Sequence, residues 1–92
     1  MGLFWTDIKP RVTEKEFQKV RSELAAHGFT LKQRDRIAEI FRSDMYGIRE
    51  KDEGISAQEI DNGIAWMREH MDEHHIPEDK IAILESQLKS RL

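Results

Sequence analysis

The sequence predicts an all-α protein, a compact bundle of about four helices with an N-terminal aromatic arm. Two observations carry this prediction: capping signals mark successive helix starts, and apolar residues recur at helical spacing after each of them. The chain has 92 residues, 38% of them apolar and 36% charged, which suits a single folded domain rather than a disordered chain. We therefore expect an arm over residues 1–12 and one helical domain over residues 13–92.

The helix starts are marked by a Ser or Thr followed three residues later by Glu or Gln, the pattern of a capping box. Three such pairs occur: Thr13 and Glu16, Thr30 and Gln33, and Ser56 and Glu59. The fourth helix start is Pro77, because proline suits the first turn of a helix. Gly28 and Gly47 stand where glycines end helices. The expected helices are 13–27, 30–46, 56–75 and 77–91.

Each expected helix carries one apolar stripe at a spacing of three or four residues. The stripes are Phe17, Val20 and Leu24; Ile37, Ile40 and Phe41; Ile60, Ile64, Met67 and Met71; and Ile81, Leu84, Leu88 and Leu92. Four stripes joined by short turns are what an antiparallel four-helix core requires. Gly63 interrupts the third helix, where glycine is unfavourable, and this indicates a close crossing with another helix.

Charge and composition restrict the function. The net charge is −3, so we do not expect a general nucleic-acid binder. No apolar run approaches the roughly 20 residues that a membrane-spanning helix needs. The chain has no cysteine, which is compatible with a cytoplasmic protein and excludes disulfides and thiolate metal sites. No motif indicates an organic cofactor, and we expect none.

Four of the apolar residues that fall outside the stripes are Phe4, Trp5, Trp66 and Ile83. Trp66 and Ile83 point away from the stripes of their own helices, since each residue turns an α-helix by about 100°. These four residues are the candidates for binding a protein partner or a second copy of the chain. The alternative is that they form a second packed surface. The preferred function is a non-enzymatic interaction or regulatory module.

The segment from His70 to His74 reads H-x-x-E-H and resembles the inverted motif of zinc metalloproteases. Such a protease also needs a distant carboxylate ligand and a larger fold, so we expect no zinc hydrolase. A divalent-metal site made by His70, His74 and His75 is the weaker alternative function. The competing interpretation is structural, because histidine suits the C-terminal end of a helix.

The junction between the second and third helices resembles a degenerate EF-hand. With Ile55 at the central apolar position of the loop, Asp52, Ser56 and Glu59 fall at ligand positions. The first ligand position is then Ile48, which has no oxygen to offer calcium. The resemblance implies a helix-loop-helix shape, and we expect no calcium site; the capping box explains most of the same residues.

The segment from Val20 to Ile37 resembles a DNA-binding helix-turn-helix, with Gly28 at the turn. The second helix of this motif would carry four cations: Lys32, Arg34, Arg36 and Arg42. Arg34, however, falls at a position that the motif buries. A DNA-binding helical regulator is therefore the alternative function, and a solvated helix surface is the competing interpretation.

Overall fold

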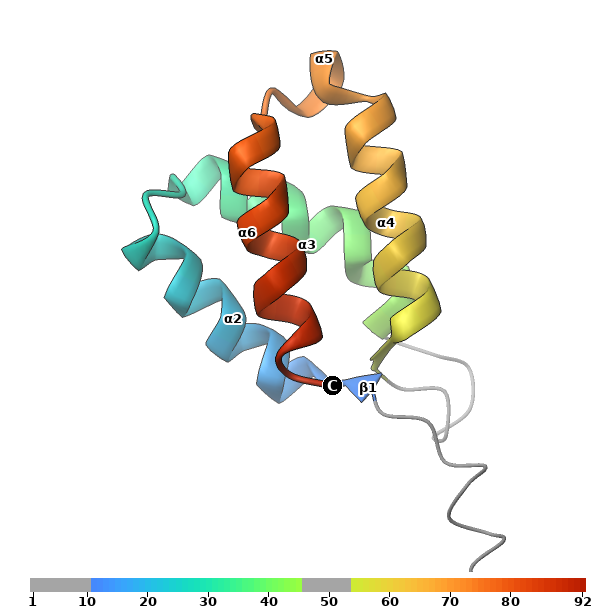
Figure 1. Ribbon diagram of the computed structural model, residues 1–92. Helices are drawn as coiled ribbons and strands as arrows, with labels where there is room; N and C mark the ends of the chain where they lie inside the picture. Colours follow the sequence, from blue (N-terminus) through green and yellow to red (C-terminus); the bar gives the residue numbers. More distant parts are fainter. Residues whose placement is uncertain (1–10, 46–53) are drawn as a thin grey trace, which may run out of the picture.

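The structure is a computed structural model that describes residues 11–45 and 54–92. It confirms the all-α fold in this part of the chain, where five helices are joined by turns and two very short strands (Figure 1). In chain order the elements are β1 (Arg11–Val12), α2 (Glu14–Ala26), α3 (Leu31–Met45), β2 (Ile55–Ser56), α4 (Ala57–Glu69), α5 (Met71–His74) and α6 (Glu78–Lys89).

The capping boxes form at the expected starts of α3 and α4. The Ser56 hydroxyl accepts a hydrogen bond from the Glu59 backbone N–H at 3.2 Å, and the Glu59 carboxylate accepts one from the Ser56 N–H at 2.8 Å. Thr30 and Gln33 form the same reciprocal pair, at 3.1 and 2.9 Å. These bonds satisfy N–H groups that a helix start leaves without partners.

The two strands pair with each other, although the sequence analysis predicted no sheet. β1 lies antiparallel to β2, with Val12 opposite Ile55, and both side chains are fully buried. Strands of two residues are too short to give a recognisable alternation of apolar and polar residues. The pairing places the start of α2 beside the start of α4.

The four predicted stripes meet in one core, apart from three residues at its edge. Ile40 and Met71 are half-buried, and Leu92 is 36% exposed. α6 lies between α2 and α4, while α3 crosses behind it (Figure 1). Phe29 and Ile76 also belong to the core. Both lie in turns, where helical spacing cannot identify buried residues.

The predicted third helix is broken into two. α4 ends at Glu69, and the four-residue α5 follows after His70. The carbonyls of Trp66 and Met67 lie at the end of α4 and are bonded by histidine rings: His70 Nδ1 lies 2.8 Å from the first, and His74 Nε2 lies 2.7 Å from the second. The His70 backbone N–H also donates to the Met67 carbonyl, at 3.3 Å, so side chains and backbone together satisfy the last carbonyls of α4.

Gly63 marks the close crossing of α4 with α3 that the sequence indicated. A Cβ atom at this position would lie 2.4 Å from Phe41 Cε1 and 2.6 Å from Phe41 Cζ. These distances are far below a normal carbon–carbon contact of about 3.5–4.0 Å. The absence of a side chain at Gly63 therefore lets the Phe41 ring lie directly on the backbone of α4.

Gly63→Ala is expected to lower the free energy of unfolding by up to about 2 kcal/mol. Overpacking costs about 1–3 kcal/mol, which outweighs the gain of about 1 kcal/mol in helix propensity. Urea unfolding of the single variant and of Gly63→Ala combined with Phe41→Leu measures this effect. The added methyl group should cost less in the Phe41→Leu background, because the ring that it meets is gone. Equal costs in both backgrounds would contradict the crossing.

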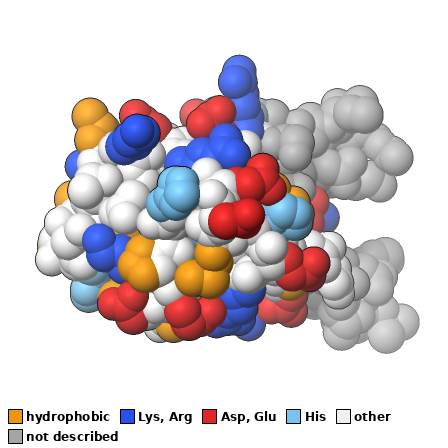
Figure 2. Space-filling view, turned by 90° about the horizontal axis from the view of Figure 1, so that it is seen from above, with side chains coloured by type: hydrophobic (Ala, Val, Ile, Leu, Met, Phe, Trp, Pro, Cys, Tyr) orange, Lys and Arg blue, Asp and Glu red, His pale blue; other side chains and the backbone are white. Residues whose placement is uncertain are grey.

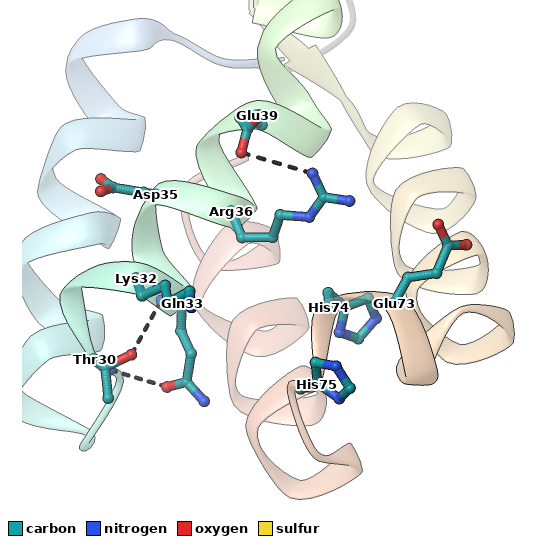
Figure 3. A pocket seen from close by; sticks show the side chains of 9 residues that line it. All are labelled: Thr30, Lys32, Gln33, Asp35, Arg36, Glu39, Glu73, His74 and His75. Atoms are coloured by element: carbon teal, nitrogen blue, oxygen red, sulfur yellow. Dashed lines mark hydrogen bonds and ion pairs between the residues drawn. The ribbon is translucent and has the colours of Figure 1, made fainter.

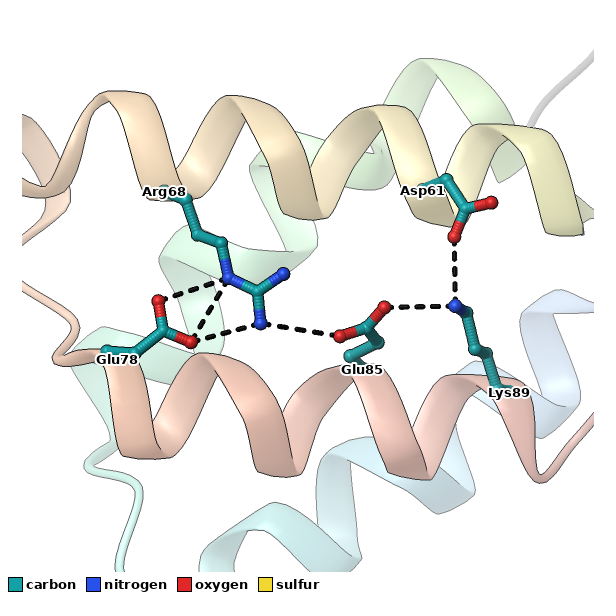
Figure 4. Close-up of polar contacts among 5 residues, drawn as sticks. All are labelled: Asp61, Arg68, Glu78, Glu85 and Lys89. Atoms are coloured by element: carbon teal, nitrogen blue, oxygen red, sulfur yellow. Dashed lines mark hydrogen bonds and ion pairs between the residues drawn. The ribbon is translucent and has the colours of Figure 1, made fainter.

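A chain of charged side chains joins the exposed sides of α4 and α6 (Figure 4). Arg68 on α4 contacts Glu78 at 3.0 Å and Glu85 at 3.4 Å. Lys89 then joins Glu85 to Asp61, at 2.9 Å to each carboxylate. The hydrogen bond from Lys89, together with the charges of Lys89 and Arg68, holds the pKa of Glu85 below its ordinary value.

Glu85→Gln is expected to lower the free energy of unfolding by about 0.2–1 kcal/mol near neutral pH, as measured for exposed ion pairs. The pKa of Glu85 is lower in the folded chain, so its contribution is complete above the unfolded pKa and is lost as the pH falls through the folded pKa. Urea unfolding should be measured at a pH above the unfolded pKa of Glu85 and at a pH below its folded pKa. The difference in stability between Glu85→Gln and the unmodified chain should disappear at the lower pH. Glu69→Gln, at an exposed carboxylate on α4, is the charge-matched control.

Candidate functional site

A pocket of about 560 Å³ opens between the first half of α3 and the turn that contains α5 (Figure 3). Nine residues line it: Thr30, Lys32, Gln33, Asp35, Arg36, Glu39, Glu73, His74 and His75. Its volume falls in the range of about 300–1,000 Å³ typical of small-molecule sites. Most of its lining side chains are polar, which is unlike the mainly apolar lining of such sites.

The α3 side of the pocket supplies hydrogen-bond donors. Arg36 reaches from α3 toward the pocket, and its nearest carboxylate is that of Glu39, at 3.7 Å (Figure 3). That separation exceeds the length of a hydrogen bond. The Gln33 carbonyl oxygen accepts from the Thr30 N–H and from Lys80. These two bonds fix the amide so that its nitrogen faces the His75 side of the pocket (Figure 3).

His74 closes the inner end of the pocket and is only 8% exposed. Its Nδ1 accepts a hydrogen bond from the Ile76 N–H at 3.0 Å, so this nitrogen carries no proton. Its Nε2 therefore carries the proton and donates to the Met67 carbonyl at 2.7 Å. Both ring nitrogens thus have backbone partners, and neither is available to a metal or to a substrate.

His75 lies at the rim of the pocket in the left-handed backbone conformation, with φ 57° and ψ 27°. Its N–H donates to the Met71 carbonyl at 2.9 Å, which ends α5 as a glycine commonly ends a helix. The conformation is uncommon for a residue with a side chain. It turns the chain from α5 toward α6 and places the exposed His75 ring beside the pocket.

The three histidines of the predicted metal site do not converge. His74 has both nitrogens occupied, and His70 Nδ1 is bound to the Trp66 carbonyl. His70 Nε2 is 3.8 Å from Glu73. Residues 11–45 and 54–92 contain no cluster of three or more histidine and acidic side chains that could hold a metal ion. In the described structure the H-x-x-E-H segment ends α4.

The predicted EF-hand positions are described only in part. Glu59, at the last ligand position, uses its carboxylate to cap Ser56 and lies 3.8 Å from Arg11. Ile48 and Asp52 lie outside the described residues. α3 and α4 do follow one another as two helices on either side of a connection that ends in β2.

The four cations of the DNA-binding alternative are not on one open surface of α3. Arg34 is half-buried, and its Nε atom is buried without a hydrogen-bond partner. Lys32 and Arg36 line the pocket, and Arg42 is exposed farther along the helix. Figure 2, which views the end of the molecule that carries α5, shows positive and negative side chains interspersed.

The partner-binding candidates divide into two groups. Phe4 and Trp5 lie outside the described residues. Trp66 and Ile83 are half-buried and pack against the core. The Trp66 ring also stacks on His70, with centroids 4.2 Å apart and planes 17° apart, and lies 6.3 Å from the His74 ring. The aromatic side chain is thereby held beside the histidines that end α4.

His74 and His75 were candidate site residues on sequence grounds, but the pocket was not predicted. From the sequence, Lys32 and Arg36 were predicted only as cations of a DNA-binding surface. Glu73 was considered only as part of the zinc-protease motif. The pocket lies between α3 and the turn that contains α5, which are far apart in the sequence, and no local pattern encodes such an approach. No helix in the described ranges is long and apolar enough to cross a membrane. Comparisons with protein-family models, curated proteins and solved structures found no match.

Proposed function

We propose that this chain is a non-enzymatic interaction module that binds another protein, or a second copy of itself, through the side formed by α3, α4 and α5. The main support is the stacking of Trp66 on His70 at 4.2 Å. Tryptophan is enriched among the residues that dominate binding energy at interfaces. A ring already held by a neighbour loses little conformational freedom when a partner covers it.

The hydrogen bonds that the side chains of the pocket already make support a role other than catalysis. The Thr30 hydroxyl accepts from the Gln33 N–H, as a helix cap. Both nitrogens of His74 are bound to the backbone. A nucleophile needs a base within hydrogen-bond reach, and the hydroxyl and the buried imidazole here have other partners.

The proposal is tested with Trp66→Gln and, as a matched control, Leu31→Ser. Leu31 is the most exposed of the large apolar residues in the described ranges, at 60%, and lies outside the pocket. Sedimentation of the purified chain over a range of concentrations detects self-association, and affinity capture followed by mass spectrometry detects another protein.

We expect the associated species to be kept by Leu31→Ser and lost by Trp66→Gln, while circular dichroism shows that both variants remain helical. The same association in Trp66→Gln and in the unmodified chain would overturn the proposed binding surface. Loss with both variants would instead show that association depends on general apolar exposure.

A further inference from the structure

The polar groups of the pocket show which chemistry it is suited to bind. Of its three carboxylates, Asp35 is bound by Arg21, while Glu39 lies 3.7 Å from Arg36 and Glu73 lies 3.8 Å from the His70 ring. In the described part of the chain, Lys32 makes no hydrogen bond or ion pair. The cationic donors of the pocket that a ligand can bind are therefore Lys32 and Arg36.

Arg36 is the central donor of this set. Its side chain is 39% exposed and makes no hydrogen bond to the described residues. A guanidinium presents five N–H donors in a planar arrangement that matches a carboxylate. The Glu39 carboxylate lies too far away to form that bidentate pair and is itself 65% exposed, so a ligand can displace it at little cost.

Two further groups lie around Arg36. The Gln33 amide nitrogen faces the pocket because the carbonyl oxygen of the same amide is held by Thr30 and Lys80. The His75 ring lies at the rim of the pocket, and the left-handed backbone conformation of His75 places it there. The donors thus come from α3 and from the turn after α5, on two sides of the same space.

We infer that the pocket binds a carboxylate of an acidic peptide segment of the partner, with Arg36 as the principal contact and Gln33 and Lys32 as additional donors. This inference rests on the proposed function, because the Trp66 ring lies 6.3 Å from the ring of His74, which lines the pocket. The acidic residues at the rim, Glu39 and Glu73, weaken binding of a bare anion and favour a peptide that also makes neutral contacts.

The test is a titration of the isotope-labelled chain with a triglutamate peptide whose ends are blocked, followed by the amide signals in NMR spectra. We expect saturable shifts confined to residues 30–39 and 70–76, with a dissociation constant of about 1 mM or tighter. A blocked trilysine peptide and inorganic phosphate are the comparison ligands, and both should bind more weakly.

Variants of the α3 side assign the contact. Arg36→Gln should weaken triglutamate binding about tenfold or more, since a charge-assisted hydrogen bond contributes about 1.5–3 kcal/mol. Arg36→Lys should restore only part of it, because an ammonium cannot form the bidentate pair. Glu39→Gln should strengthen binding about two- to fivefold by removing the competing carboxylate. Lys15→Gln removes an exposed positive charge of α2 and should leave the shifts in place.

Several outcomes would overturn the inference: no saturable shifts, equal binding of trilysine, binding unchanged in Arg36→Gln, or phosphate binding as tightly as triglutamate. The last would show an anion site without a preference for peptides. A partner that depends on Trp66 but not on Arg36 would remove the carboxylate contact and leave the proposed function standing. Triglutamate binding without any association that depends on Trp66 would count against the proposed function instead.

Discussion

Phe41→Ala is expected to lower the free energy of unfolding by about 3–5 kcal/mol, the cost of removing a buried aromatic ring. Phe41 is fully buried, lies 6.5 Å from the Phe17 ring between centroids, and covers the backbone of α4 at Gly63. Truncation leaves a cavity where α3 meets both α2 and α4. For a domain whose total stability is about 5–15 kcal/mol, such a loss is large.

Urea unfolding followed by circular dichroism measures this effect. Leu31→Ala is the control, because Leu31 is 60% exposed on the same helix and its truncation should change stability by less than about 0.5 kcal/mol. The loss of stability in Phe41→Leu should lie between those in Phe41→Ala and Leu31→Ala. A Phe41→Ala variant as stable as Leu31→Ala would show that α3 does not pack on α4 in this way.

His74→Ala is expected to lower the free energy of unfolding by about 2–4 kcal/mol. The side chain joins the Met67 carbonyl at the end of α4 to the Ile76 N–H before α6. The Ile76 N–H is left without an acceptor, which costs about 1–3 kcal/mol, and the Met67 carbonyl keeps only the longer bond from the His70 N–H, at 3.3 Å. The loss should be accompanied by faster amide exchange at Ile76, because its hydrogen-bond acceptor is gone.

The control for this variant is His27→Ala, at an exposed histidine after α2, which should be nearly neutral. Zinc titration of the unmodified chain gives an independent check. Strong zinc binding that is lost in His74→Ala would contradict the structural role of His74, since its nitrogens would have to leave their backbone partners.

Local patterns predicted the helix starts because a cap involves residues only three apart. Ser56 with Glu59, and Thr30 with Gln33, form the expected bonds. The break at His70 could not be predicted in this way. The segment around it is apolar at helical spacing, and the break is stabilised by a side chain that reaches seven residues back, from His74 to Met67.

The candidate site was predictable in its residue types but not in its arrangement. His70 and His74 were identified by their spacing, which suggests a shared metal on a continuous helix, and His75 was added as their neighbour. The chain turns after Glu69, so the histidines no longer lie on one face of a continuous helix. His74 is buried in the core, and His75 lies at the rim of the pocket. Arg36 became part of the site only through tertiary packing, because nothing near it in the sequence distinguishes it from other surface cations.

The pairing of β1 with β2 has a consequence for the order of folding. Arg11 donates to the Gly54 carbonyl across a separation of 43 residues, and closing a flexible loop of that length costs about 3 kcal/mol of chain entropy. Four paired residues offer little to offset this cost on their own. We therefore expect α2 and α3 to dock first and shorten the effective loop, with the strands joining late in the folding reaction. Substitutions at Val12 should accordingly speed unfolding and leave the folding rate almost unchanged.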